Sequence, residues 1–95
     1  MATGEFFLTI HPEPTKAGTF IDKAKYKVLR EAILRNLRKF GSLTFAQLGA
    51  CLEAELQPTF SGSVLWYYTT VKLDMEARGE IRRVPNSRPQ LIEAI

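Results

Sequence analysis

Lysine and arginine side chains are the residues of this sequence whose chemistry stands out, because they gather in two segments. Residues 23–40 carry seven basic side chains against one acid, and residues 81–95 carry three against one. The stretch between these segments is mildly acidic. A phosphate-bearing partner would favour such segments. The alternative is a solvated helix face together with a solvated hairpin, which the overall charge of +3 also accommodates.

A second phosphate-binding feature is predicted where a third helix begins. Ser61, Gly62 and Ser63 precede its apolar stripe, and either serine can cap the helix. Backbone amides left free at a helix N-terminus suit a phosphate group. The outer face of this helix consists of Ser63, Trp66, Thr69, Thr70 and Leu73.

That outer face favours weak binding to DNA over recognition of a base sequence. It lacks Asn, Gln and Arg, the side chains that make bidentate pairs with adenine and guanine. Threonine and serine discriminate only weakly between bases. The later part of the helix also brings acids that would repel a DNA backbone if they faced it: Asp74, Glu76 and Glu80.

Catalytic and metal-binding chemistry is not predicted. His11 has no acid or nucleophile near it in the sequence, whereas general acid–base catalysis needs a partner held by a rigid scaffold. Cys51 is the single cysteine and is expected to fill an apolar space. One cysteine with one histidine cannot form a zinc cluster, and no glycine-rich phosphate loop is present. We expect no enzyme activity, no metal and no cofactor.

Three helices must position these side chains. Asp22 is a good N-cap, and the helix after it ends at Gly41. The inward stripe of this helix is Tyr26, Leu29, Ile33, Leu37 and Phe40. Residues 42–44 can form one short strand. Thr44 and Gln47 then make a capping box for a second helix, whose stripe is Phe45, Leu48, Leu52 and Leu56.

The third helix and a C-terminal hairpin complete the domain. The helix runs to Gly79 with its inward stripe formed by Val64, Tyr67 or Tyr68, Val71 and Met75. Residues 81–84 and 90–94 are predicted strands, separated by a turn with a proline on each side.

The residues before the first helix are expected to be extended. Phe6 to Ile10 is a short apolar run, and Pro12, Pro14 and Gly18 disfavour a helix after it. We therefore divide the chain into an N-terminal strand or extended arm, residues 1–18, and a folded domain, residues 19–95. The run has no basic start, so a signal peptide is not expected. No segment approaches the roughly 20 apolar residues of a membrane span.

The passage from the third helix into the hairpin carries the most specific local pattern. It reads MEARGEIRR over residues 75–83 and resembles the L-E-x-x-G-x-I-x-R junction between a winged-helix recognition helix and its wing. With the strings GTFIDKAKYKVLREAIL, LTFAQL and GSVLWYYTTVKLDMEARGEIRRVPNSRPQ, residues 18–91 resemble a family of small bacterial winged-helix-like proteins of unknown function. The resemblance implies a winged helix, and it implies DNA binding by analogy only.

Trp66 and Leu73 lie seven residues apart on the outer face of the third helix, where they are costly to leave in water. The hairpin or the segment Phe6-Phe7-Leu8 could fold over them. They could instead form a partner surface for a homodimer or another protein, or Trp66 could stack on a base. A partner surface would make the protein an interaction module without DNA binding, with an interface formed by Trp66, Leu73, Phe6 and Phe7.

We predict an α+β, mainly α, winged-helix domain with an N-terminal extended arm. It is expected to be a cytoplasmic module of regulatory type that binds double-stranded DNA weakly or non-specifically. The residues predicted to contact DNA are Lys23, Lys27, Ser61, Ser63, Trp66, Thr69, Thr70, Arg82, Arg83 and Arg88. The chain is expected to be a monomer or a weak homodimer and to bind no membrane.

Overall fold

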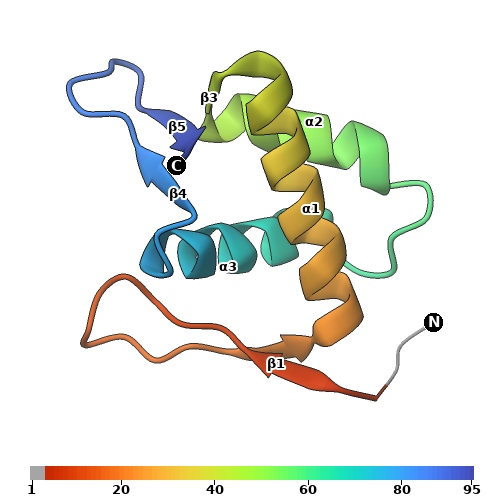
Figure 1. Cartoon of the computed structure of the whole chain (residues 1–95). Coiled ribbons are helices and arrows are strands. Elements are labelled where there is room, and N and C mark those ends of the chain that lie inside the picture. Colours follow the sequence, from red (N-terminus) through yellow and green to blue (C-terminus); the bar gives the residue numbers. More distant parts are fainter. Residues whose placement is uncertain (1–3) are drawn as a thin grey trace.

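Three helices form the centre of the molecule, and two small sheets flank them (Figure 1). The computed structural model describes residues 4–95, so residues 1–3 of the expected arm lie outside the described part. The fold class is α+β, as predicted. One sheet is a hairpin at the start of the chain, and the other joins a short strand to the C-terminal hairpin.

The first helix, α1 (Lys23–Phe40), begins and ends where its sequence predicts. The carboxylate of Asp22 accepts hydrogen bonds from the amides of Ala24 and Lys25 at 2.8 and 3.1 Å. Gly41, at φ 85°, ends the helix. The predicted stripe is buried except for Phe40, which is half exposed, so that part of the prediction is wrong. Phe40 occupies the last position of the helix, and there the ammonium of Lys39 lies over its ring.

The second and third helices also follow the predicted signals. In α2 (Phe45–Leu56), the Thr44 and Gln47 side chains form the expected capping box. In α3 (Val64–Ala77), the Ser63 hydroxyl accepts the hydrogen bond that caps the helix. The third helix is two residues shorter than predicted. Gly79 adopts a positive φ of 75° that reverses the chain direction.

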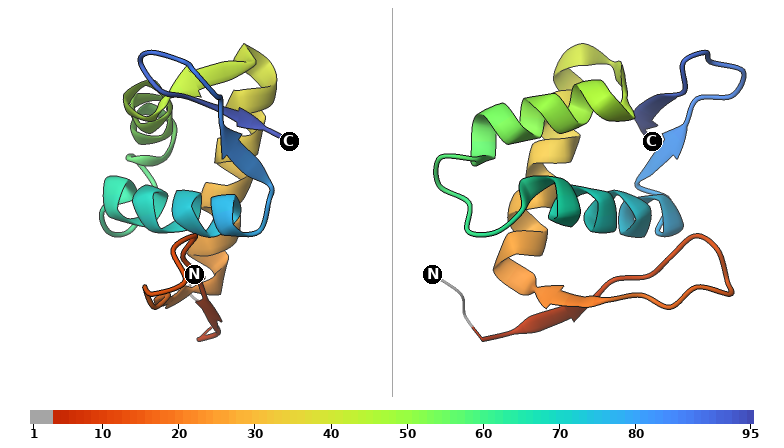
Figure 2. Two further views of the ribbon diagram at one scale, coloured as in Figure 1. Left: turned by 90° about the vertical axis from the view of Figure 1, so that its left-hand side faces the viewer. Right: turned by 180° about the vertical axis from the view of Figure 1, so that it is seen from behind.

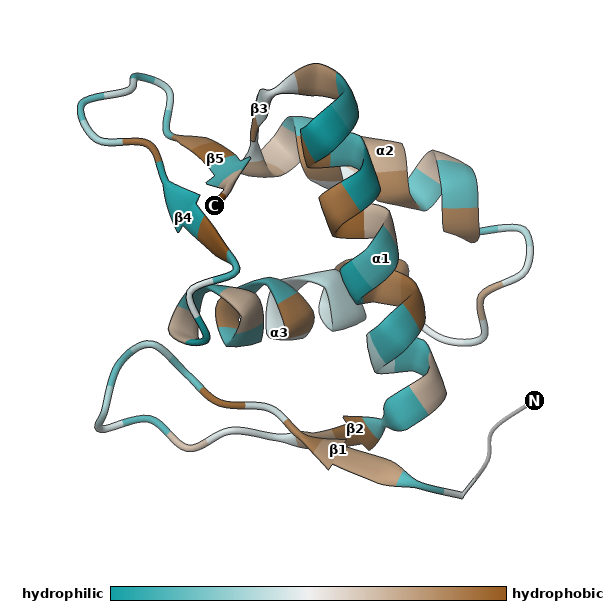
Figure 3. Cartoon of the chain, viewed as in Figure 1, coloured by the Kyte–Doolittle hydropathy of each residue, from teal (hydrophilic) through white to brown (hydrophobic). Residues whose placement is uncertain are grey.

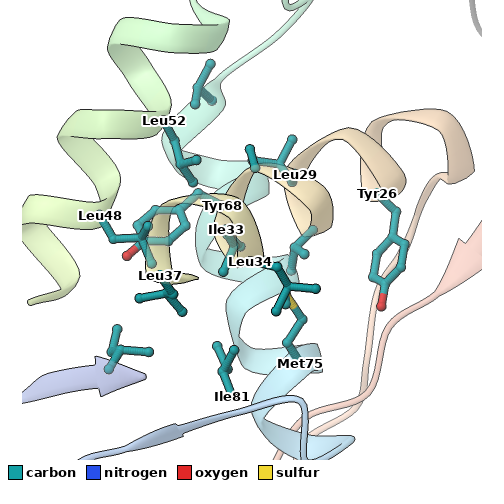
Figure 4. Close-up of a cluster of buried hydrophobic side chains, with 14 of the residues drawn as sticks. Tyr26, Leu29, Ile33, Leu34, Leu37, Leu48, Leu52, Tyr68, Met75 and Ile81 are labelled. Atoms are coloured by element: carbon teal, nitrogen blue, oxygen red, sulfur yellow. The ribbon is translucent and has the colours of Figure 1, made fainter. Parts of the chain in front are cut away.

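The core lies where the three helices meet. Leucine, isoleucine and tyrosine side chains from α1, α2 and α3 fill it (Figure 4). Tyr68 is fully buried, and its hydroxyl donates to the backbone oxygen of Phe45 at 2.8 Å. This bond satisfies the one polar atom of the Tyr68 side chain and ties α3 to the start of α2.

The C-terminal sheet closes one side of the core. Its strands β3 (Ser42–Thr44), β4 (Ile81–Arg83) and β5 (Leu91–Ala94) have the order β3-β5-β4, and both pairings are antiparallel. Ile81 and Ile92 point into the core. Both the predicted short strand and the predicted hairpin are confirmed.

The N-terminal segment folds back on itself instead of running out as an arm. Strand β1 (Phe6–Leu8) pairs with β2 (Phe20–Asp22), which sequence analysis did not predict. Beyond the strands, Thr9 and Thr19 exchange backbone and hydroxyl hydrogen bonds of 2.9 Å. The resulting hairpin lies below α3 and next to the start of α1 in Figure 1.

Candidate functional site

Asp74 of α3 is buried and does not face a possible DNA backbone. Its carboxylate accepts hydrogen bonds from the Tyr26 hydroxyl at 2.6 Å, the Ile10 amide at 2.9 Å and the Arg78 Nε at 3.0 Å. Burial, together with the bond to Asp74, holds the pKa of the Tyr26 hydroxyl above its ordinary value. Asp74 therefore joins the N-terminal hairpin, α1 and α3.

The other two acids of this region are paired with cations of the same chain. Glu80 accepts hydrogen bonds from Nε and Nη2 of Arg30, with Nη2 and Oε2 2.7 Å apart, and this pairing lowers the pKa of Glu80. Glu76 is nearly buried between Lys72 at 3.1 Å and Arg83 at 3.2 Å. The predicted repulsion of phosphate by these acids is therefore largely cancelled inside the protein.

The arginines predicted to contact DNA are in part occupied. Arg82 pairs with Glu93 at 2.6 Å, and Arg83 pairs with Glu76. Arg88 lies exposed in the loop between β4 and β5, and no ion pair to it occurs among residues 4–95. Of the three, Arg88 is the one whose charge is not offset by an ion pair among the described residues.

The start of α1, which carries Lys23 and Lys27, lies away from the C-terminal hairpin (Figure 1). Lys23 pairs with Glu5 at 3.6 Å, and Lys27 is exposed. Both lie near the start of α1, which adjoins the beginning of α3, whereas β4 follows the end of α3 (Figure 2). At a rise of 1.5 Å per residue, the 14 residues of α3 between these two places extend about 20 Å. The structure does not bring the predicted cations together.

One lysine of α1, which sequence analysis missed, lies beside the beginning of α3. Lys25 Nζ lies 5.4 Å from the ring centre of Phe60 and 5.0 Å from that of Tyr67, directly beside Gly62. Ser61 and Ser63 are exposed there, and Ser61 and Lys25 line an open cavity of about 320 Å³. No spacing rule relates Lys25 to residues 60–67, so only the tertiary structure reveals this neighbourhood.

The solvent-facing side of α3 is apolar. Leu65 and Trp66 expose 44% and 49% of their surface, and Thr69 follows them one turn later. Phe45, at the start of α2, is also exposed, so its place in the predicted inward stripe of the second helix is wrong; its other side stacks on Tyr68. We call this surface the α2–α3 face; it comprises Phe45, Leu65, Trp66 and Thr69.

The threonine hydroxyls of α3 are turned to their own helix. Thr69 Oγ1 donates to the Leu65 carbonyl at 2.9 Å, and Thr70 Oγ1 donates to the Trp66 carbonyl at 3.1 Å. Their hydroxyl protons are thus already used. The two residues offer methyl groups and oxygen lone pairs, but no free donor, to a partner.

Trp66 and Leu73 do not share one exposed surface. Leu73 and Thr70 line a small cavity of about 70 Å³ with residues 9–11 and 17–19, so the N-terminal hairpin covers that end of α3. Trp66 stays half exposed, with its ring edge-on to Tyr67. Phe7 is turned inward and stacks on Tyr26, with ring centres 4.0 Å apart.

Within residues 4–95, no three or more His, Cys, Asp or Glu side chains are grouped as a metal site would require. In the same residues, no helix combines the length and the apolar character needed to cross a bilayer.

Residues 8–92 match a protein family described as a family of unknown function (DUF6958). No curated protein and no solved structure matches the chain.

Proposed function

The chain belongs to the DUF6958 family, and we propose that residues 19–95 form a winged-helix module that binds a partner protein through the α2–α3 face. The order helix, strand, two helices and hairpin supports the winged-helix assignment. So does the strand order β3-β5-β4, in which the last strand is central. In this assignment α3 occupies the place of a recognition helix and the β4–β5 hairpin is the wing.

The observation that carries the functional proposal is the apolar character of the α2–α3 face. Where a DNA-reading helix would offer arginine, asparagine or glutamine to bases, this helix offers Leu65 and Trp66. Aromatic side chains that are exposed beside other apolar groups are typical of protein interfaces. A partner that fits this face would insert apolar side chains beside the indole of Trp66.

Trp66 provides both the test variant and a spectroscopic signal, because it is the only tryptophan of the chain. We expect Trp66→Ser to weaken binding of a partner by about thirtyfold or more, as for an interface hot spot. The partner is first captured from cell extract on the immobilised chain and then purified, and its affinity is measured by calorimetry. Phe40→Ser, at another exposed apolar position, is the matched control and should bind normally.

Fluorescence separates docking on this face from docking elsewhere. When a partner without tryptophan covers the indole, the emission of Trp66 should shift to shorter wavelength. If every protein retained by the native chain is retained equally by Trp66→Ser, the α2–α3 face is not the docking surface.

Weak binding to duplex DNA is the second candidate, and Lys25 is the observation that favours it. Its ammonium lies beside Gly62, next to the exposed Ser61 and Ser63 at the start of α3. A helix N-terminus with an adjoining cation suits a phosphate. Lys27, which like Lys25 belongs to α1, and Arg88 in the wing would add positive charge without recognising bases.

We expect the native chain to bind random duplex DNA only at low salt. With about three phosphate contacts, the slope of log affinity against log salt would be about −3. Lys25→Ala with Lys27→Ala should make the slope shallower by about 2. Arg82→Ala should change it little, because Arg82 is paired with Glu93. Fluorescence anisotropy of labelled DNA measures both quantities, and a native chain that shows no binding at low salt removes this candidate.

A further inference from the structure

The outward face of the N-terminal hairpin is apolar except at Asp22, which lies opposite Phe6 and whose carboxylate caps α1. The pairing sets Phe7 opposite Ile21, and these two point toward α1. Because side chains alternate along a strand, their neighbours point away from the protein. This outer hairpin face comprises Phe6, Leu8, Ile10 and Phe20, which expose 69%, 46%, 40% and 67% of their surface. In Figure 3 both strands appear brown at the margin of the molecule.

The outer hairpin face is as large as the biggest apolar patches of soluble proteins. A fully exposed aromatic side chain presents about 200 Å². The four side chains together therefore leave roughly 400 Å² of apolar surface in water, within the range of patches that mark interaction sites. Leu8 and Phe20 lie directly opposite each other and form its centre.

The face is held rigidly although its strands are short. Phe7 stacks on Tyr26, and the Ile10 amide is bound by the buried Asp74. Arg78 places its guanidinium 5.0 Å from the ring centre of Phe7. These contacts fix the inner side of the hairpin against α1 and α3. A partner would thus find the outer face already formed, which reduces the entropy that binding costs.

We propose that a second copy of this chain covers the outer hairpin face and forms a two-fold symmetric dimer. Charge supports this occupant. Two copies with a net charge of +3 repel each other, but on this face the charged side chain of the two strands, Asp22, is bound by the first amides of α1. An ion pair also lies toward each end of the hairpin, Glu5 with Lys23 and Glu13 with Lys16. A copy therefore meets an apolar surface whose neighbouring charged groups are already paired or hydrogen-bonded.

The geometry and the area of the face also suit a copy of itself. Two twisted sheets pack face to face about 10 Å apart with interdigitating side chains. A symmetric contact buries the patch of both copies, roughly 800 Å² of apolar surface. When the polar atoms at its rim are included, the buried area approaches about 1,200 Å², the lower limit for a specific interface. The dimer is therefore weak and depends on concentration.

This interface is distinct from the α2–α3 face, so the inference goes beyond the proposed function. Trp66 and Phe20 belong to different surfaces. Substitution of Trp66 should therefore leave dimerisation unchanged, and substitution of Phe20 should leave the binding of a partner to the α2–α3 face unchanged. A dimer would present two α2–α3 faces at once, which raises the apparent affinity for a partner with two binding sites.

Sedimentation velocity over a wide concentration range tests the proposal. For the native chain, we expect the mass to rise from 10.8 kDa toward twice that value as concentration increases. Phe20→Glu should remain monomeric at every concentration, because two-fold symmetry would bury two carboxylates in the contact. Phe40→Glu makes the same substitution at another exposed phenylalanine, at the end of α1, and should dimerise as the native chain does.

Three results would overturn the proposal. The native chain could stay monomeric at the highest concentration, Phe20→Glu could dimerise normally, or Trp66→Ala could abolish the dimer, which would place the contact on the α2–α3 face. Circular dichroism establishes that each variant is folded. If Phe20→Glu is not folded, Phe6→Ser provides the same test at the edge of the face, with a weakened dimer expected and normal dimerisation contradicting the proposal.

Discussion

Replacement of Asp74 by alanine is expected to lower the free energy of unfolding by about 3–5 kcal/mol, the cost of breaking a buried charged contact. The carboxylate is fully buried and accepts bonds from the Tyr26 hydroxyl, the Ile10 amide and Arg78. Alanine would leave the Tyr26 hydroxyl buried without an acceptor, and the Ile10 amide and the Arg78 guanidinium without their partner. Urea unfolding followed by circular dichroism measures the loss.

Two control variants separate the buried carboxylate from charge in general. Glu31→Ala removes an exposed acid from α1 and should change stability by less than about 0.5 kcal/mol. Asp74→Asn keeps one acceptor oxygen and should lose less than Asp74→Ala. If Asp74→Ala is as stable as Glu31→Ala, the three bonds do not hold the hairpin to the helices.

Gly18→Ala is expected to open the N-terminal hairpin. A Cβ atom at this position would lie 1.5 Å from the carbonyl oxygen of Thr9 and 2.6 Å from its carbonyl carbon. Both atoms belong to the backbone, so no side-chain rotation relieves the clash. The strands must separate where Thr9 and Thr19 are joined by hydrogen bonds. We expect a loss of about 2 kcal/mol or more, in the upper part of the range for point mutations.

Amide hydrogen exchange locates this effect. The Thr9 and Thr19 amides should exchange much faster in Gly18→Ala, whereas amides in the middle of α1 should stay protected. Thr15→Ala, at an exposed position of the same loop, should leave exchange at Thr9 and Thr19 unchanged. Native protection of Thr9 in Gly18→Ala would show that the backbone can accommodate a methyl group there.

The helices and the C-terminal sheet could be predicted because their signals are local. Asp22, Thr44 with Gln47, and Ser63 each form the cap that their residue type indicates. The N-terminal hairpin could not be predicted in this way. Strand β2 has only three residues, too few for a periodic pattern, and its partner lies 12 to 16 residues earlier in the chain. The need for glycine at position 18 comes from a contact with Thr9, which no local rule contains.

The candidate site was harder to predict than the fold, because charge counts ignore pairing. Arg82 and Arg83 stand out in the sequence as a basic pair, yet both are bound to acids of the same protein. Asp74 lies on the same helix as Trp66, but the hairpin and Tyr26 enclose it. Lys25 lies at the start of α3 because the loop that contains Phe60 packs against α1, and no local sequence pattern indicates that contact.

The bonds of Asp74 also limit how far this polypeptide can be trimmed for laboratory use. A fragment that starts at Thr19 would keep the acid and Tyr26 but discard Ile10 and the segment that shields them. The carboxylate would then lie in a half-open hollow with one donor missing. A shortened polypeptide that is to stay folded should therefore retain the first hairpin. Alternatively, Asp74 and Tyr26 should be replaced together by an apolar pair of similar volume.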